Sequence, residues 1–182
     1  MNIAIVGATG NVGRKILEVI EKINFEFSEL YLIASDKSIG KNITFKGKTY
    51  SIIGLNDFDF SKVKIAFFSA GSVIAEKWAP IAAKKTVVID NSKYFRMDKD
   101  IPLVVPEVNA DTLKNYKNKN IIANANCSTI QLVLALTSEL NSILTDSECP
   151  INTGTLTHVA LKGIFEPKIF FVSTVIFHSS FV

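Results

Sequence analysis

Residues 1–23 run M-N-I-A-I-V-G-A-T-G-N-V-G-R-K-I-L-E-V-I-E-K-I, and this stretch decides the fold. Its apolar, largely β-branched run from Ile3 to Val6 predicts a buried strand. G-A-T-G-N-V-G follows at once at 7–13, with three glycines spaced three residues apart. Apolar residues then recur at helical spacing from Val12 to Ile23, which predicts a helix. The chain therefore opens with a strand, a glycine-rich turn and a helix.

The three glycines suit a turn that holds the pyrophosphate of a dinucleotide. Gly7 allows the tight turn, Gly10 lets the backbone approach the pyrophosphate, and Gly13 lets the helix pack closely on the strand. The helix N-terminus adds free N–H groups and the positive end of a dipole. An ordinary glycine-rich turn is the alternative, but the place between a buried strand and a helix favours a dinucleotide site. The predicted cofactor residues of this loop are Gly7, Thr9, Gly10, Asn11, Val12 and Gly13.

The rest of the chain alternates short apolar runs with helical ones. A helix is expected over 73–83, with Trp78 and Ile81 on its apolar side, and the run at 46–53 is either a hairpin arm or an edge strand. All-apolar strands that alternate with helices predict a parallel sheet covered on both faces. Right-handed crossovers then make it a doubly wound α/β domain of Rossmann type. Further strands are expected at 30–34, 63–68, 87–89, 103–105 and 121–124.

The end of the second strand, A-S-D-K-S-I-G, bears on the choice of cofactor. An acidic residue there usually binds the ribose of NAD, and Asp36 would suit that role. Ser35, Lys37 and Ser38 could instead bind the 2′-phosphate of NADP. We predict NADP in preference to NAD, with an ordinary polar turn as the alternative.

Cys127 lies where an apolar strand gives way to a helix, in I-I-A-N-A-N-C-S-T. A thiol reacts as the thiolate, which the positive end of the helix would favour. Ser128 or Thr129 could help to cap that helix. The amides of Asn124 and Asn126 could hold an oxyanion. The alternative is a small buried apolar residue at a bend, and the local pattern does not choose between the two.

Composition and charge exclude several classes of protein. Hydrophobic residues make up 48% of the 182 and charged residues 20%, which is typical of a globular domain. The lysines are scattered and the net charge is only +3, so no nucleic-acid surface is indicated. Cys127 and Cys149 have no metal-type spacing to each other or to the two histidines, so no metal site is predicted, and Cys149 is expected to be a small buried residue. With no signal peptide and no run of about 18 apolar residues, a cytoplasmic protein without a membrane span is expected.

The pattern becomes less regular beyond Leu140. The stretch at 169–177 is apolar and strand-like, and such a strand needs a sheet to enter. We therefore divide the chain into a dinucleotide-binding domain at 1–136, which includes the cysteine loop, and an atypical tail at 137–182, interpreted as a remnant of a second domain.

Six segments of the chain lie in an order that is specific as a set: G-A-T-G-N-V-G at 7–13, L-I-A-S-D-K-S-I-G at 32–40, F-S-A-G at 68–71, D-N-S-K-Y-F-R-M at 90–97, L-V-V-P-E-V-N at 103–109 and I-I-A-N-A-N-C-S-T at 121–129. Together they resemble aspartate-semialdehyde dehydrogenase, over residues 1–136. N-acetyl-glutamyl-phosphate reductase is similar in fold and in its cysteine, but V-P-E-V-N and N-A-N-C-S-T fit it less well.

The resemblance implies an oxidoreductase that reduces aspartyl phosphate to aspartate semialdehyde with NADPH and releases phosphate, on the route to lysine, methionine and threonine. Cys127 would be the nucleophile that forms an acyl-enzyme thioester, which divides one hard step into two. Asn126 would lie beside it and help to place the substrate. Arg96 would bind phosphate, whereas without the flanking motifs it would be an ordinary surface arginine. The resemblance also implies cofactor contacts from strand-end turns, at Ser69, Ala70, Gly71, Asn91 and Ser92.

Some positions depart from the family pattern. Ala125 stands where the family usually has proline, Lys93 where it has serine, and Lys37 where it commonly has arginine. In the family, a second domain supplies a substrate-binding arginine, a general-base histidine and much of a homodimer interface. That domain is expected to be largely missing here, and His158 lacks the setting of the base. A non-catalytic remnant that binds nucleotide is therefore the alternative to an active enzyme.

Overall fold

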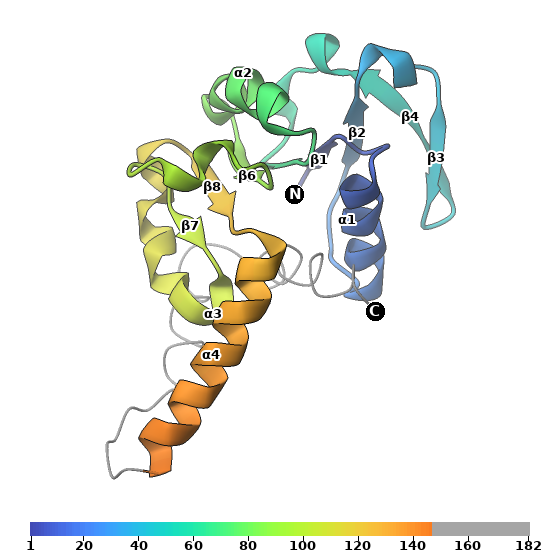
Figure 1. Cartoon of the computed structure of the whole chain (residues 1–182). Coiled ribbons are helices and arrows are strands. Elements are labelled where there is room, and N and C mark those ends of the chain that lie inside the picture. Colours follow the sequence, from blue (N-terminus) through green and yellow to red (C-terminus); the bar gives the residue numbers. More distant parts are fainter. Residues whose placement is uncertain (147–182) are drawn as a thin grey trace.

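The computed structural model describes residues 1–146, and for 138–146 the backbone alone. This part holds an eight-stranded sheet in the order β3-β4-β2-β1-β5-β6-β8-β7 (Figure 1). Neighbouring strands are parallel except for β3 and β4. The strands are β1 (Ile3–Val6), β2 (Leu30–Ala34), β3 (Asn42–Phe45), β4 (Lys48–Gly54), β5 (Ile65–Phe68), β6 (Val87–Asp90), β7 (Leu103–Val104) and β8 (Ile121–Asn124).

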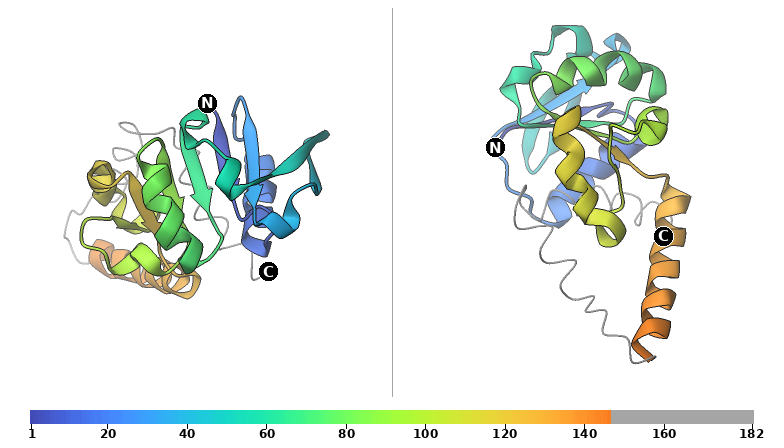
Figure 2. Two further views of the ribbon diagram at one scale, coloured as in Figure 1. Left: turned by 90° about the horizontal axis from the view of Figure 1, so that it is seen from above. Right: turned by 90° about the vertical axis from the view of Figure 1, so that its left-hand side faces the viewer.

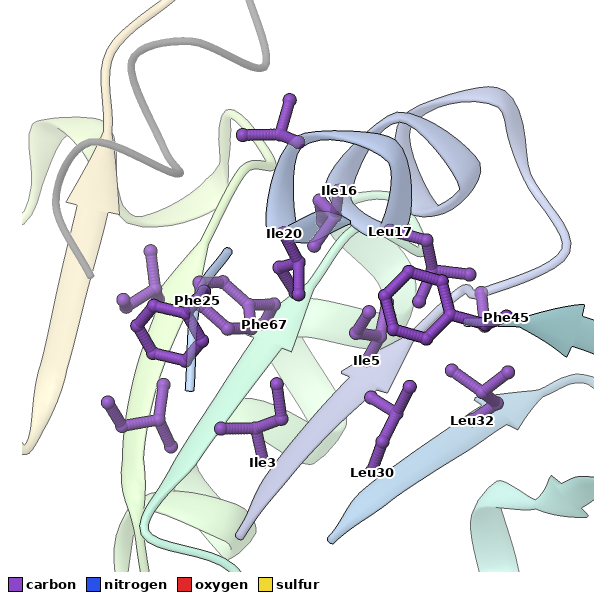
Figure 3. Close-up of a cluster of buried hydrophobic side chains, with 14 of the residues drawn as sticks. Ile3, Ile5, Ile16, Leu17, Ile20, Phe25, Leu30, Leu32, Phe45 and Phe67 are labelled. Atoms are coloured by element: carbon purple, nitrogen blue, oxygen red, sulfur yellow. The ribbon is translucent and has the colours of Figure 1, made fainter. Parts of the chain in front are cut away.

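β1 lies inside the sheet, between β2 and β5, and all four of its residues are buried. Because side chains alternate along a strand, Ile3 and Ile5 enter the core on one face, whereas Ala4 and Val6 enter the core on the other. Figure 3 shows the first core, where side chains of β1, β2 and β5 meet those of α1 (Asn11–Lys22). A strand buried on both faces has to be apolar throughout, which is why I-A-I-V predicted it.

Helices cover both faces of the sheet, which confirms the doubly wound fold (Figure 2). α1 packs Ile16 and Ile20 into the first core, and α2 (Ser72–Ala83) covers the other face. The prediction that Ile81 lies on the apolar side of α2 was wrong, because its side chain is 46% exposed. Trp78, predicted on the same side, is partly buried against the core. Small side chains occupy this face because they let the helix lie close to the sheet. The buried residues of α2 are Ala75, Ala79, Ala82 and Ala83.

A hairpin forms one end of the sheet. β3 and β4 pair antiparallel through a turn at Lys46 and Gly47, which have φ of 48° and 75°. The sequence allowed the run from Lys46 to be a hairpin arm or an edge strand. It is a hairpin arm, because β4 begins at Lys48 and also pairs in parallel with β2, so that β3 forms the edge.

α4 (Cys127–Asp146) follows β8 and extends away from the sheet (Figure 1). It runs without a break through position 136, where the sequence suggested a division, and that division stays a prediction. No second domain is present within residues 1–146, and none of the helices there is long and apolar enough to cross a membrane. Cys149, His158 and the run at 169–177 lie outside the described residues.

Candidate functional site

The carboxyl ends of β1 and β5 mark the point where the order of strands reverses. From β1 the chain moves outward through β2 to β4, and then returns to place β5 on the other side of β1. The turns after β1 and β5 therefore lie side by side, as in the crevice where α/β sheets bind ligands. The N–H of Gly7 donates to Ile33 O at 2.8 Å, and the N–H of Ser69 donates to Val6 O at 2.8 Å. The predicted glycine loop and the S-A-G turn are thus brought together.

Two of the three glycines are required by the packing of this turn. Gly7 has φ of +89°, and a Cβ on it would lie 2.7 Å from the carbonyl oxygen of Ser69. A Cβ on Gly13 would lie 2.3 Å from the carbonyl oxygen of Gly7, so α1 starts directly against the end of β1. Gly10 is exposed, and a Cβ there would lie 3.3 Å from the same oxygen. Gly10 is the least constrained by the protein and the most open to a ligand.

The N-terminus of α1 has the features of an anion site. Its first helical bond runs from Arg14 N to Gly10 O at 3.0 Å, so the N–H groups of Asn11, Val12 and Gly13 precede that bond. No side chain caps this end and no acidic residue lies in the first turn. Unused N–H groups and the helix dipole together favour a phosphate. This geometry fits the pyrophosphate of a dinucleotide.

The turn after β2 presents a cation beside this loop. Ser35 and Lys37 are exposed, whereas Ser38 is buried and donates its N–H to Ser35 O at 2.8 Å. Asp36 Oδ1 lies 3.7 Å from where a Cβ on Gly54 would stand. Gly54 ends β4, on the side of β2 away from β1, so the Asp36 carboxylate is directed away from the glycine loop.

Polar side chains after β6 and β8 connect these two strands. Asn124, the last residue of β8, is 2% exposed and donates from Nδ2 to Asn91 Oδ1 at 2.7 Å. The N–H of Asn91 donates to Phe68 O at 2.9 Å, which ties it to the end of β5. The amide of Asn124, expected to face an oxyanion, therefore already has a protein partner. Ser92 is likewise buried, with its hydroxyl bonded to Asp90 and to Tyr94 N.

Arg96 bridges the same two strand ends. It belongs to η4, a 3₁₀ helix over Tyr94–Met97, and is partly buried. Its Nε donates to Asn124 O at 3.0 Å and its Nη2 donates to Asn91 O at 3.1 Å. Nη1 makes no protein hydrogen bond within the described part of the chain. The guanidinium is therefore fixed on one side and can still bind an anion on the other.

Cys127 is the first residue of α4 and is partly exposed. Asn126 caps the helix: its Oδ1 accepts from Ser128 N at 3.0 Å and its carbonyl accepts from Ile130 N at 2.9 Å. The expectation that Ser128 or Thr129 would cap was wrong, because the helix starts earlier than either residue. Ala125 and Ile130 are buried together and fix the angle at which α4 leaves β8. The partly exposed Cys127 thus lies at a capped helix N-terminus, with its Sγ 4.0 Å from Ser128 Oγ.

Comparison with known proteins agrees with this arrangement. The model of the semialdehyde dehydrogenase NAD binding domain matches residues 2–116. The chain belongs to this family. The match includes the glycine loop, the turn after β5 and Arg96.

Relatives of this semialdehyde dehydrogenase domain confirm the resemblance seen in its sequence. Aspartate-semialdehyde dehydrogenase of Aquifex aeolicus is 57% identical over 136 residues, which are 74% of this chain and 40% of that protein. The crystal structure of aspartate-semialdehyde dehydrogenase II from Vibrio cholerae, complexed with ASA, is 54% identical with a TM-score of 0.73, over 74% of this chain and 44% of that one. The enzyme with NADP from Candida albicans is 25% identical with a TM-score of 0.60, over 78% and 47%. The chain spans about 40% of the length of the curated relatives it matches.

Sequence analysis of the domain missed the buried acid Asp90. Asp90 directly follows the strand expected at 87–89, and in the structure it is 1% exposed and its Oδ1 has no hydrogen-bond partner. Burial raises the pKa of its carboxyl above the ordinary value, although hydrogen bonds from Ser92 and the charge of Arg96 act in the opposite direction. A lone Asp at a strand end is a weak signal, and D-N-S drew notice only as part of the resemblance. Within residues 1–146 no group of three side chains could hold a metal ion.

Proposed function

We propose that this chain carries the cofactor and thiol half of an aspartate-semialdehyde dehydrogenase, with Cys127 as nucleophile and NADP as cofactor. One observation carries the proposal. A helix N-terminus suited to phosphate and the partly exposed Cys127 at a second helix N-terminus lie along the same carboxyl edge of one sheet, with the Arg96 guanidinium beside the strand that leads to the thiol. The names of its relatives supply aspartate semialdehyde as one substrate, and the resemblance implies aspartyl phosphate as the other.

The chemistry follows from the groups at that edge. The Cys127 thiolate would attack the acyl carbon of aspartyl phosphate, forming a C–S bond as the C–O bond to phosphate breaks, which gives a thioester and inorganic phosphate. Nη1 of Arg96 would bind phosphate oxygens, because guanidinium–phosphate bonds are strong and directional. Bound NADPH would supply the hydride that reduces the thioester, so that the aldehyde leaves and the thiolate is regenerated. Asn126 precedes Cys127 in the chain, and with its Oδ1 bonded to Ser128 N, the N–H groups of its side chain would help to place the substrate.

Three observations support NADP over NAD. The Asp36 carboxylate faces Gly54 and β4 and is directed away from the ribose side of the turn. Lys37 is exposed and can pair with a 2′-phosphate, as can the hydroxyl of exposed Ser35. A related enzyme has been crystallised with NADP. The other predicted contacts, from Ser69 to Gly71 and at Asn91, belong to the same proposal.

A second candidate function is nucleotide binding without turnover. It is favoured by the uncapped N-terminus of α1, because that observation supports phosphate binding without requiring turnover. A reductase acting on N-acetyl-glutamyl phosphate is less well supported, since the curated relatives are aspartate-semialdehyde dehydrogenases. A cytoplasmic location and a homodimer stay predictions from the resemblance.

The test is phosphate-dependent reduction of NADP by the purified 182-residue chain with aspartate semialdehyde. Activity that is lost in Cys127→Ser and kept in Cys149→Ser supports the enzyme. Binding of NADP by calorimetry with no turnover supports the second candidate and rejects the first for this chain. A chain that binds neither NADP nor NAD rejects both.

A further inference from the structure

Asp90 is an unusual residue to find at the end of a buried strand. Its side chain shares a face of β6 with Val88 and lies beside Phe68 and Ala123 of the neighbouring strands. Its Oδ2 accepts from Ser92 Oγ at 2.6 Å, while its Oδ1 is buried without a partner. A buried polar atom without a hydrogen bond destabilises the fold. The stability of the fold alone would favour an apolar residue at position 90, so the presence of a carboxyl group there calls for a reason other than stability.

The bond from Asp90 orders the turn that follows β6. Ser92 is 8% exposed, and its hydroxyl donates to Asp90 and accepts from Tyr94 N at 3.1 Å. Tyr94 is the first residue of η4, which carries Arg96. Because the hydroxyl makes both bonds at once, the carboxyl group sets the rotamer of Ser92, and Ser92 sets where η4 begins.

The same turn holds the end of β8. Asn91 accepts from Asn124 Nδ2 and from Arg96 Nη2, and Arg96 Nε reaches Asn124 O. Asn124 is three residues before Cys127, so the chain keeps their Cα atoms within about 11 Å. That separation is close to the Debye length, about 10 Å at ordinary ionic strength. Because Arg96 Nε is bonded to Asn124 O, its charge lies at a comparable separation from the thiol, where salt weakens but does not abolish its attraction for an approaching anion.

We propose that Asp90 is a positioning residue for Cys127: its buried carboxyl group holds Ser92, and Ser92 holds the turn that places Asn91 and the Arg96 guanidinium against the strand leading to the thiol. The proposal deepens the proposed function, on which it rests for the role of Cys127. It differs from a purely structural role, in which the bond between Asp90 and Ser92 stabilises a turn with no effect on the thiol.

The experiment measures the alkylation of Cys127 in the 182-residue chain carrying Cys149→Ser, so that one thiol remains. Iodoacetate is anionic and iodoacetamide is neutral, so the rate constant for iodoacetate divided by that for iodoacetamide rises when a cation lies beside the thiol. Dividing this ratio by the same ratio for N-acetylcysteine removes the intrinsic difference between the two reagents. Ser92→Val and Ser92→Thr form a matched pair, since the two residues are nearly isosteric and only threonine keeps the hydroxyl. We expect Ser92→Val and Asp90→Ala to lower the ratio by up to about twofold, and Ser92→Thr to restore it.

Two further variants sharpen the result. Ser61→Ala breaks the same local motif at an exposed turn, where Ser61 Oγ donates to Asp59 Oδ2 at 2.7 Å, and it should leave the ratio unchanged. Asp90→Asn keeps an oxygen that accepts from Ser92 and should leave the ratio at the wild-type value.

Three outcomes would overturn the proposal. The first is a lower melting temperature in Ser92→Val with an unchanged ratio, which leaves a structural role only. The second is a wild-type ratio equal to that of N-acetylcysteine, and the third is failure of both Ser92→Val and Ser92→Ala to fold. None of these readings needs nucleotide or turnover, so a chain that fails the activity test can still pass this one.

Discussion

Replacing Gly13 with alanine tests the contact on which the nucleotide loop depends. The new methyl group would lie 2.3 Å from the carbonyl oxygen of Gly7 and 2.7 Å from the Cα of Ala8. Both atoms belong to the backbone of the turn after β1, so no side-chain rotation relieves the contact. The start of α1 would have to move by roughly 1 Å to restore an ordinary separation.

Two effects of opposite sign determine the result. Alanine in place of glycine within a helix stabilises by about 0.5–1 kcal/mol. Overpacking against a fixed neighbour costs about 1–3 kcal/mol. The upper end applies here, because moving α1 also disturbs Ile16 and Ile20, which are fully buried in the core. We therefore expect Gly13→Ala to lower the free energy of unfolding by about 2 kcal/mol.

Urea denaturation, followed by the fluorescence of Trp78 and by circular dichroism, measures this loss. With a slope near 2 kcal/mol/M the midpoint should fall by about 1 M. Gly10→Ala is the matched control, since its methyl group would lie 3.3 Å from the same oxygen at an exposed site. It should lose no more than about 1 kcal/mol, as expected for a weaker N-cap, yet it should weaken NADP binding. A Gly13→Ala chain as stable as the wild type would refute the close approach of α1.

Three other substitutions give separate tests. Because burial raises the pKa of Asp90, the folded chain keeps this proton to a higher pH than the unfolded chain. The free energy of unfolding of the wild type should therefore fall relative to that of Asp90→Asn as the pH rises from about 4, until the difference between the two chains levels off. Urea midpoints that differ by the same amount at every pH would exclude a raised pKa for Asp90. Asn126→Ala removes the acceptor of Ser128 N and should destabilise α4 by about 1 kcal/mol, which circular dichroism would detect as lost helical signal. Asn115→Ala, at an exposed position, should leave that signal unchanged. Lys37→Ala should weaken NADP binding about tenfold, as expected for the loss of one charged hydrogen bond, while NAD binding stays within about twofold of the wild type. Calorimetry that showed an equal loss of affinity for both nucleotides would exclude a contact to the 2′-phosphate.

The opening of the fold could be predicted because its signals are local. The helix expected over Val12 to Ile23 is found at Asn11–Lys22, and Gly7 and Gly13 have the packing roles that their spacing indicated. Ile81 was misplaced because periodicity finds an apolar side of a helix but not how close that helix lies to the sheet. The cap of α4 was misassigned because it depends on where the helix starts to within one residue, and the chain turns at Asn126.

Other parts of the candidate site depend on contacts that no local pattern contains. Asn91 and Asn124 are 33 residues apart and meet only because β6 and β8 are neighbours in the sheet. Arg96 could be named from the resemblance, but its bonds to two backbone carbonyls follow from the same pairing. Asp90 was missed because a strand end tolerates a polar residue, and only the packing of β6 between β5 and β8 shows that this one is enclosed.

These contacts make the cofactor side and the thiol side parts of one continuous edge. Gly7 is bonded to the end of β2, Ser69 to the end of β1 and Asn91 to the end of β5, and Asn91 then holds Asn124. Each turn that would contact a ligand is thus fixed by the strand beside it. A substitution at one turn should shift its neighbours, because such residues share partners and their effects are not additive. NADP affinity and the rate of Cys127 alkylation should therefore be measured on the same variants. If every variant that changes one of these quantities leaves the other unchanged, the two halves act independently despite the bonds that join them.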